Sequence, residues 1–157
     1  MHFSTEVVEL RAARSTDFKF AWSLYEELMR PLTEELLGQW NEPGQKQVVE
    51  MALAQEGAFI IVQDELDAGW MQVIESPDGL YLGQIYVAPP FQNRGIGTTI
   101  LWELIGKVRE CSKILTLDVM KNNRSRLLYE RLGFQVVGQS DYKLKMQWRE
   151  AAPHGRS

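Results

Sequence analysis

The sequence predicts an α+β fold: a single domain in which a mixed central sheet of about six to seven strands is flanked by helices. The 157 residues, 45% of them hydrophobic, can fill one core. Several short apolar runs bounded by turn residues are typical of strands. Longer segments with apolar residues at helical spacing lie between these runs. We expect the domain to occupy residues 1–150, with a flexible tail at 151–157.

The first half of the chain is expected to form one strand, a helical region and then an antiparallel meander. Ser15, Thr16 and Asp17 offer capping chemistry ahead of the first helix. Pro31 is expected to break that helix or to open the next one. The expected elements are a strand at 7–13, a helix from Phe18 that places Trp22, Tyr25 and Met29 at helical spacing, a helix at 32–38, a turn at 41–44, a helix at 45–55, and strands at 58–63, 68–75 and 80–87.

The second half alternates helices and strands. We expect a helix at 95–111, a strand at 114–119, a helix at 123–132 closed by Gly133, and strands at 134–139 and 142–148. The resulting order is one strand, helices, three strands, helix, strand, helix and two strands. This order favours one mixed sheet with helices against it.

Composition excludes several functional classes. A net charge of −4 argues against a general nucleic-acid binder, which normally presents a basic face. The N-terminus lacks a basic and apolar leader, and no apolar run has membrane-spanning length, so we expect a cytoplasmic protein without membrane contact. The single cysteine, Cys111, cannot form an internal disulfide, and with only His2 and His154 beside it we expect no metal site.

Residues 85–100 form the most informative segment, because they lead from a strand through a glycine turn into an amphipathic helix. Gly95 and Gly97 let the backbone turn tightly. The first amides of a helix starting near Ile96 have no intrahelical acceptors, so they could bind phosphate with help from Arg94. The Gly-Lys-Ser/Thr of a Walker loop is absent, as is the third small residue of a dinucleotide fingerprint.

Two motifs together resemble the GNAT-type N-acetyltransferase superfamily. The first is Gln92-x-x-Gly95-x-Gly97. The second is the block from Leu117 to Phe134, with Asn122 and the run Leu-Tyr-Glu-Arg-Leu-Gly-Phe. The resemblance implies the GNAT fold and direct transfer of an acetyl group from acetyl-CoA to a primary amine of a small molecule or peptide. It assigns cofactor binding to Ile85, Val87, Gln92, Asn93, Arg94, Gly95, Ile96, Gly97, Thr98, Asn122, Ser125 and Tyr129.

Catalytic roles follow from the same resemblance. Tyr129 is the candidate acid for the leaving thiolate, since a phenol is protonated at neutral pH; the alternative is a purely packing role. The backbone amide of Val87 is the candidate donor to the oxyanion, although a buried core valine is an equally good interpretation. Asn122 could contact pantetheine or only cap the helix, and the adjacent Asn123 competes for either role.

The sequence does not identify a general base or the acceptor. Candidate bases are Glu26, Glu27, Glu34, Glu35 and Glu75, while Gln84 and Tyr86 could instead order water. Arg30 and three aromatic residues, Trp22, Tyr25 and Trp40, could enclose an amine, although Trp22 and Tyr25 are better explained as core. A non-catalytic acyl-CoA sensor and an interaction domain stay open as alternatives, as does a homodimer.

Overall fold

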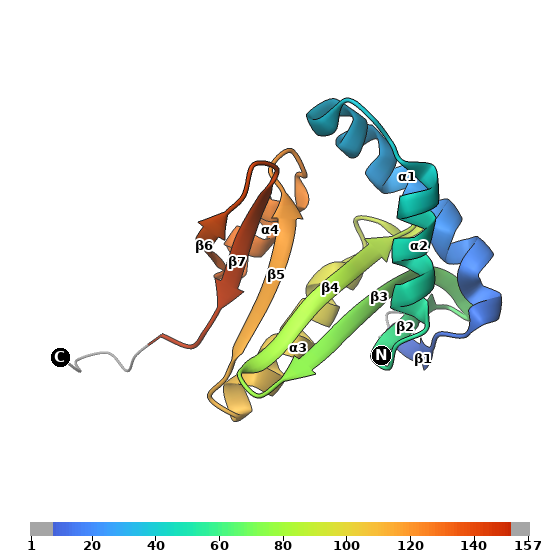
Figure 1. Cartoon of the computed structure of the whole chain (residues 1–157). Helices are drawn as coiled ribbons and strands as arrows, with labels where there is room; N and C mark the ends of the chain where they lie inside the picture. The colour runs from blue at the N-terminus through green and yellow to red at the C-terminus, as the bar shows by residue number, and fades with distance from the viewer. Residues whose placement is uncertain (1–7, 152–157) are drawn as a thin grey trace.

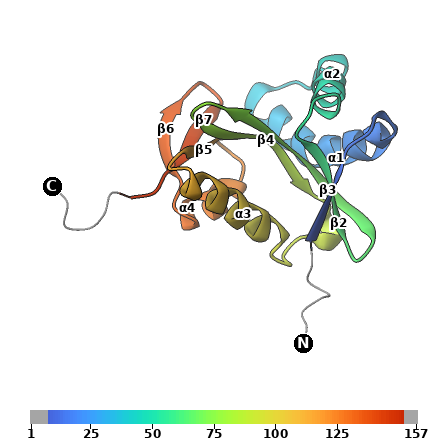
Figure 2. The same ribbon diagram turned by 90° about the horizontal axis from the view of Figure 1, so that it is seen from below.

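The computed structural model describes residues 8–151 and shows one mixed sheet between two layers of helices (Figures 1 and 2). The seven strands of this sheet follow the order β1-β2-β3-β4-β5-β7-β6. All neighbouring strands are antiparallel except β4 and β5, which are parallel. The predicted α+β class and mixed sheet are therefore confirmed. Val7 and residues 152–157 of the expected tail, like His2 and His154, lie outside the described residues.

The elements follow the predicted order, except that one helix replaces the two expected between residues 18 and 38. They are β1 (Val8–Ala12), the 3₁₀ turn η2 (Ser15–Asp17), α1 (Phe18–Leu37), α2 (Glu42–Leu53), β2 (Ala58–Gln63), β3 (Leu66–Ser76), β4 (Gly79–Val87), η3 (Pro89–Phe91), α3 (Ile96–Glu110), β5 (Ile114–Met120), α4 (Ser125–Arg131), β6 (Gln135–Gln139) and β7 (Lys143–Trp148). No helix within the described range is long and apolar enough to span a membrane.

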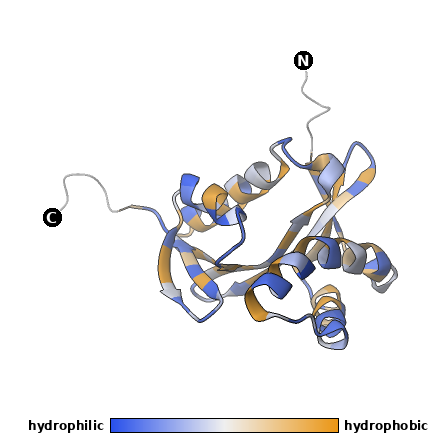
Figure 3. Ribbon diagram, turned by 90° about the horizontal axis from the view of Figure 1, so that it is seen from above, coloured by the Kyte–Doolittle hydropathy of each residue, from blue (hydrophilic) through white to orange (hydrophobic). Residues whose placement is uncertain are grey.

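Each face of the sheet carries its own hydrophobic core. Helices α3 and α4 pack on one face, and α1 and α2 pack on the other. Figure 3 shows hydrophobic residues running through the strands between these two helical layers. Burial of a large aliphatic side chain contributes about 1.5–3 kcal/mol, so a helix with several such side chains is held firmly. The buried residues of α3 recur at helical spacing: Ile96, Ile100, Leu101, Leu104, Ile105 and Val108.

Helix α1 continues across Pro31, so the predicted break is wrong. A proline inside a helix lacks the N–H that would bond to the carbonyl four residues earlier, here that of Glu27. Contacts beyond the proline offset this loss. The Asn122 side chain donates to the Leu32 carbonyl at 3.1 Å, and the buried Thr33 hydroxyl lies 3.9 Å from a methionine sulfur of β5. Tertiary packing therefore keeps both parts of the helix in one element.

Two turns differ from the expected boundaries. Residues 41–44 belong mostly to the start of α2, because the Asn41 side chain accepts a hydrogen bond from the Gly44 amide at 3.2 Å and caps the helix. The turn between β2 and β3 contains only Asp64 and Glu65, whose φ angles are +53° and +68°. Such paired left-handed residues are typical of a type I′ hairpin, and β3 therefore begins earlier than predicted.

Asp17 precedes α1, but its side chain makes no capping hydrogen bond to that helix, contrary to expectation. The carboxylate instead accepts from the Arg14 amide at 2.8 Å and from two nitrogens of the Arg11 guanidinium at 2.9 and 3.1 Å. Arg11 also donates to Asp67 at 3.3 Å. The hydrogen bond from Arg11 lowers the pKa of Asp17, and burial only partly opposes this shift. The cluster joins β1 to the turn before α1 and to β3.

Strands β4 and β5 pair over only part of their length. The parallel register runs from Gly79 with Ile114 to Leu82 with Leu117. Residues 83–87 and 118–120 extend beyond the last pair, where the two strands diverge, as Figure 1 shows. The ladder between β3 and β4 shifts register at the same level of β4. Gln72 pairs with Gln84, but the next residue of β3 pairs with Leu82, so Gly83 is skipped. The sheet is therefore split on one side of β4.

We expect Asp17→Asn to lower the free energy of unfolding by about 2 kcal/mol at pH 7, because hydrogen bonds to charged groups contribute about 1.5–3 kcal/mol. The folded-state pKa of Asp17 is depressed. Its stabilisation is therefore present above the unfolded pKa of about 3.9 and is lost as the pH falls through the folded value. Urea unfolding should show that the free energies of unfolding of wild type and variant differ widely at pH 7. At about pH 2 the two values should be close. An equal difference at both pH values would contradict the assignment, and Asp141→Asn serves as an exposed control.

Candidate active site

A cleft of about 670 Å³ lies at the split between β4 and β5. Its walls come from both faces of the sheet: α1 on one side, and α3, α4 and the loop before α3 on the other. Most of the predicted site residues line it, namely Ile85, Val87, Gln92, Asn93, Gly95, Ile96, Gly97, Thr98, Ser125 and Tyr129. The structure thus brings together the two sequence motifs, which come from separate parts of the chain.

The glycine loop presents free backbone amides to this cleft. Asn93 and Gly95 have φ angles of +64° and +81°, which turn the chain into α3. The first bond of the helix runs from the Thr99 amide to the Gly95 carbonyl at 2.9 Å. The amides of residues 96–98 therefore have no intrahelical acceptor. The Gln92 side chain donates to the Val87 carbonyl at 2.8 Å and ties the loop to the end of β4.

Gly95 and Gly97 differ in what they contribute. Gly95 requires the left-handed conformation, as expected from a tight turn, and a Cβ there would meet open space. Gly97 lies inside the helix without a positive φ, and a Cβ there would lie 3.7 Å from Leu128 of α4, at ordinary contact distance. The turn itself therefore does not need Gly97. Its missing side chain leaves room in the cleft in front of the helix amides.

Backbone amides of β4 also point into the split. The Ala88 amide donates to the Ala68 carbonyl of the neighbouring strand at 2.7 Å. Because bonded and non-bonded pairs alternate in an antiparallel ladder, the amides of Ile85 and Val87 point away from β3. On that side β5 has already separated from β4. The two strands therefore splay apart beside Val87, which leaves the amide of this candidate donor without a partner strand.

Tyr129 is buried and lines the cleft from α4, with 7% of its surface exposed. Its ring lies 5.7 Å from that of Phe134. Burial raises the pKa of Tyr129 to about 12, so the phenol is protonated at neutral pH and can donate a hydrogen bond. The packing role and the role of a donor in the cleft are thus compatible.

Two of the predicted site residues lie outside the cleft lining. Arg94 lies over the ring of Phe91, with the guanidinium carbon 5.4 Å from the ring centroid. Asn122 donates to the Leu32 carbonyl at 3.1 Å and to the Glu35 carboxylate at 2.6 Å, and so fastens the end of β5 to α1.

Asn123, the alternative to Asn122, and Arg131, which the sequence analysis did not single out, line the cleft. Asn123 lines the cleft, and its side chain accepts from the Ser125 amide at 2.8 Å. Arg131 supplies a cation at the cleft from the end of α4. The sequence analysis had already weighed Asn123 against the adjacent Asn122 for this role. Nothing in the spacing favoured Arg131 over Arg126 of the same helix.

The candidate bases on α1 are engaged elsewhere or lie outside the cleft lining. Arg30 donates to Glu26 at 3.2 Å and to Glu34 at 3.1 Å, forming i,i+4 pairs on the surface of α1. Glu35 accepts from Asn122, while Glu27 is exposed and absent from the lining. Glu75, the remaining candidate base, lies on β3 and borders a separate cavity of about 200 Å³.

The aromatic residues near α1 form a packed cluster on that face of the sheet. Trp22 and Trp40 lie 6.0 Å apart, and Tyr25 lies 5.4 Å from Tyr86 in an edge-on arrangement. Of these four, only Tyr86 lines the cleft. The Tyr86 hydroxyl donates to the Gln84 side chain. The two residues that could have ordered water are therefore hydrogen-bonded to each other. The core interpretation of Trp22 and Tyr25 agrees with this packing.

The chain matches the Acetyltransferase (GNAT) family over residues 21–134. This match covers more than half of the sequence, and the chain therefore belongs to that family. No curated protein sequence matches it significantly. Within residues 8–151, no cluster of three or more histidine, cysteine or acidic side chains is arranged to hold a metal ion.

Solved structures of similar fold come from several organisms. The PaiA N-acetyltransferase of Thermoplasma acidophilum, solved in complex with coenzyme A, has a TM-score of 0.71 at 15% identity, covering 92% of this chain and 99% of that one. A GNAT-family acetyltransferase of Streptococcus agalactiae has a TM-score of 0.71 at 17% identity, and the match covers 92% of this chain and 96% of that one. The ribosomal-protein-S18-alanine N-acetyltransferase of Escherichia coli has a TM-score of 0.62 at 20% identity, and the match covers 96% of this chain and 99% of that one. At these identities the likeness establishes the fold.

Alanine substitutions at the two loop glycines should separate their roles. We expect Gly95→Ala to destabilise the fold by about 1–2 kcal/mol, because a Cβ is disfavoured in the left-handed region. Gly97→Ala should leave stability unchanged or raise it by up to about 1 kcal/mol, since alanine favours a helix. Urea unfolding measures both changes. A loss of stability in Gly97→Ala as large as that in Gly95→Ala would show that both glycines serve the turn.

Proposed function

We propose that the protein transfers an acetyl group from acetyl-CoA directly to a primary amine of a small molecule or peptide. Family membership supports acetyl transfer in general. The observation that supports the fuller proposal is that one cleft is lined by three kinds of donor. These are the free amides of the glycine loop, the amides of β4 beyond its last pair with β5, and the phenol of Tyr129. The relative with bound coenzyme A, and the relative named for an alanine of a ribosomal protein, are consistent with this reaction.

The loop would bind the pyrophosphate of acetyl-CoA. Free amides at the start of a 15-residue helix and the positive end of its dipole favour an anion there. Gly97 lets a phosphate approach these amides closely, and Arg131 adds a positive charge at the cleft. Because the chain is acidic overall, such local contacts must outweigh its net charge.

The reacting groups would meet in the split. The amides of Ile85 and Val87 would donate to the oxygen of the thioester carbonyl as it develops negative charge, because preorganised donors of this kind stabilise an oxyanion. When the carbon–sulfur bond breaks, the thiolate needs a proton or a hydrogen bond. The Tyr129 hydroxyl can supply it, since its raised pKa keeps the phenol protonated over the whole neutral range.

Titration with acetyl-CoA in a calorimeter tests the proposed site. We expect saturable binding to one site, and a ligand at about a hundred times its dissociation constant should add roughly 2.7 kcal/mol of stability in a melt. Gly97→Ala should weaken this binding about tenfold or more, because its methyl group blocks close approach to the amides. Thiol release over a panel of primary amines then tests transfer. A folded wild type that binds no acetyl-CoA would rule out the proposal, whereas binding without release for any amine would favour a sensor.

Tyr129→Phe should lower turnover about a hundredfold, in the range of general acid catalysis, while binding of acetyl-CoA changes little. The phenyl ring keeps the packing against Phe134 and removes only the hydroxyl. Steady-state thiol release and calorimetry measure the two effects separately. Tyr142→Phe is the matched control, since Tyr142 is exposed between β6 and β7. Equal turnover in wild type and Tyr129→Phe would remove the hydroxyl from the mechanism.

A further inference from the structure

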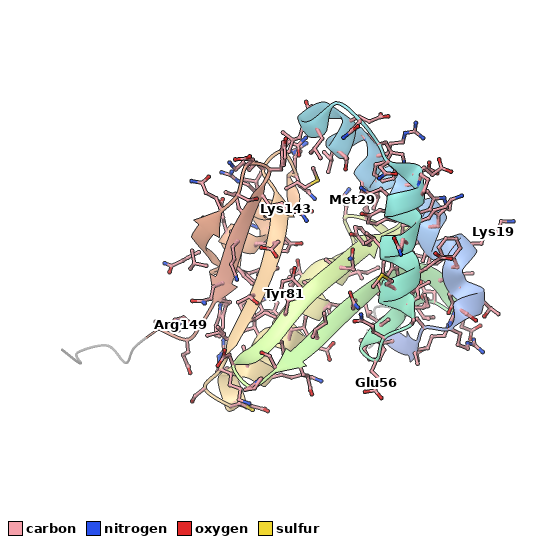
Figure 4. The ribbon with its side chains drawn as sticks, in the orientation of Figure 1. Lys19, Met29, Glu56, Tyr81, Lys143 and Arg149 are labelled. Carbon is pink, nitrogen blue, oxygen red and sulfur yellow. The ribbon has the colours of Figure 1, made fainter. Side chains whose placement is uncertain are left out.

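Helix α1 gives the cleft an uncharged wall. Leu28, Met29 and Leu32 line the cleft from this helix, and their spacing places them on one side of it. All three are half-buried, and Leu28 and Met29 also pack against the core beneath α1. Figure 4 shows Met29 on the side of α1 that is turned toward β4 and β5. We call these three residues the α1 wall, and part of their apolar surface stays open to the cleft.

The charged side chains of α1 lie on a different side of the helix. Glu26, Arg30 and Glu34 follow one another at intervals of four positions and form a row. Arg30 donates to Glu26 at 3.2 Å and to Glu34 at 3.1 Å. Glu35 accepts from the Asn122 side chain at 2.6 Å. None of these charged groups lines the cleft, so the helix presents only the α1 wall to a ligand.

The cleft as a whole offers no negative charge to a ligand. In the described part of the chain, no aspartate or glutamate lines it, and Arg131 is its one charged side chain. Tyr86 borders the cleft and belongs to the same core as Leu28 and Met29. Burial raises the pKa of Tyr86 well above its usual value, so this phenol is neutral as well. An ammonium group that stays charged in the cleft would therefore lose hydration without gaining a carboxylate partner.

The α1 wall lies on the side of the cleft that the co-substrate leaves open. Under the proposed function, acetyl-CoA occupies the side formed by the glycine loop and α4, with its thioester beside Val87. The α1 wall borders the same cleft from the other face of the sheet, so an amine that attacks the thioester would contact it. Burial of apolar surface favours binding. Apolar surroundings also favour the neutral amine, which is the form that attacks, over the ammonium.

We propose that the α1 wall selects an acceptor with one amino group and an apolar body beside it, and that it disfavours diamines and other polycationic amines. The inference rests on the proposed acetyl transfer and names the class of its acceptor. The apolar body packs against Leu28, Met29 and Leu32, whereas a second ammonium group would lie against the wall without a carboxylate. The reaction consumes one neutral amine and one thioester and yields one amide and one thiol, so it needs no further reactant.

Acetylation of matched amines tests this selection. Hexylamine and hexamethylenediamine have the same carbon chain and differ by one amino group at its far end, and ethylamine is the short member of the panel. Alkyl amines share a pKa near about 10.4, so their protonation in solution does not separate them. We expect kcat/KM from thiol release to be about tenfold or more higher for hexylamine than for either of the other two. The diamine should be the poorer substrate although it offers two amino groups.

Substitutions of Met29 locate the selection on the α1 wall. Met29→Glu places a carboxylate there and should lower the ratio of kcat/KM for hexylamine to that for hexamethylenediamine about tenfold. Met29→Ala removes apolar surface without adding charge and should lower kcat/KM for hexylamine about fivefold more than that for ethylamine. Met51→Glu is the matched control, because Met51 is exposed on α2 and lies outside the cleft lining. Melting temperature and acetyl-CoA binding, measured for each variant, report on the fold and the co-substrate site.

The outcomes separate this inference from the proposed function. A preference for hexylamine that falls in Met29→Glu and persists in Met51→Glu supports the inference. Equal use of hexylamine and the diamine by wild type would overturn it, as would an unchanged ratio in Met29→Glu. A preference for hexanoyl-CoA over acetyl-CoA, without any effect of amine length, would also overturn it and assign the α1 wall to the acyl chain. If wild type acetylates no amine at all, the proposed function itself fails.

Discussion

Strands β4 and β5 pair only as far as Leu82 and Leu117, and the separation of their remaining residues creates the cleft that the whole site borders. A continuous sheet would have used the outward amides of Ile85 and Val87 in a ladder. The split leaves them directed at open space and opens a passage between the two faces of the sheet.

Each side of the split needs support, because neither strand stabilises the other there. On the face that carries α3 and α4, the support is α3, whose row of buried aliphatic residues fixes the helix and thereby the position of its free N-terminal amides. On the opposite face the support is α1, which continues across Pro31 and is fastened to the segment after β5 by Asn122. Rigid elements at both edges keep the cleft open while its interior stays accessible.

Charges in this region are arranged locally, in keeping with the acidic composition. The amides of the loop and Arg131 offer positive potential where an anion would bind. Outside the cleft lining, the Tyr81 hydroxyl donates a hydrogen bond to the Asp118 carboxylate. Tyr129 lines the same cleft, and burial raises its pKa and keeps the phenol protonated.

The sequence alone determined the α+β class, the element order and the composition of the glycine loop, because periodicity and turn chemistry act between near neighbours in the chain. The tertiary structure decided which of two adjacent asparagines lines the cleft and that Pro31 stays inside a helix. It also placed Arg131 rather than Arg94 at the cleft and Asp118 beside Tyr81. These outcomes depend on contacts such as Asn122 with Leu32, ninety residues apart. Local spacing cannot encode such pairings, since the packing of the whole sheet sets them.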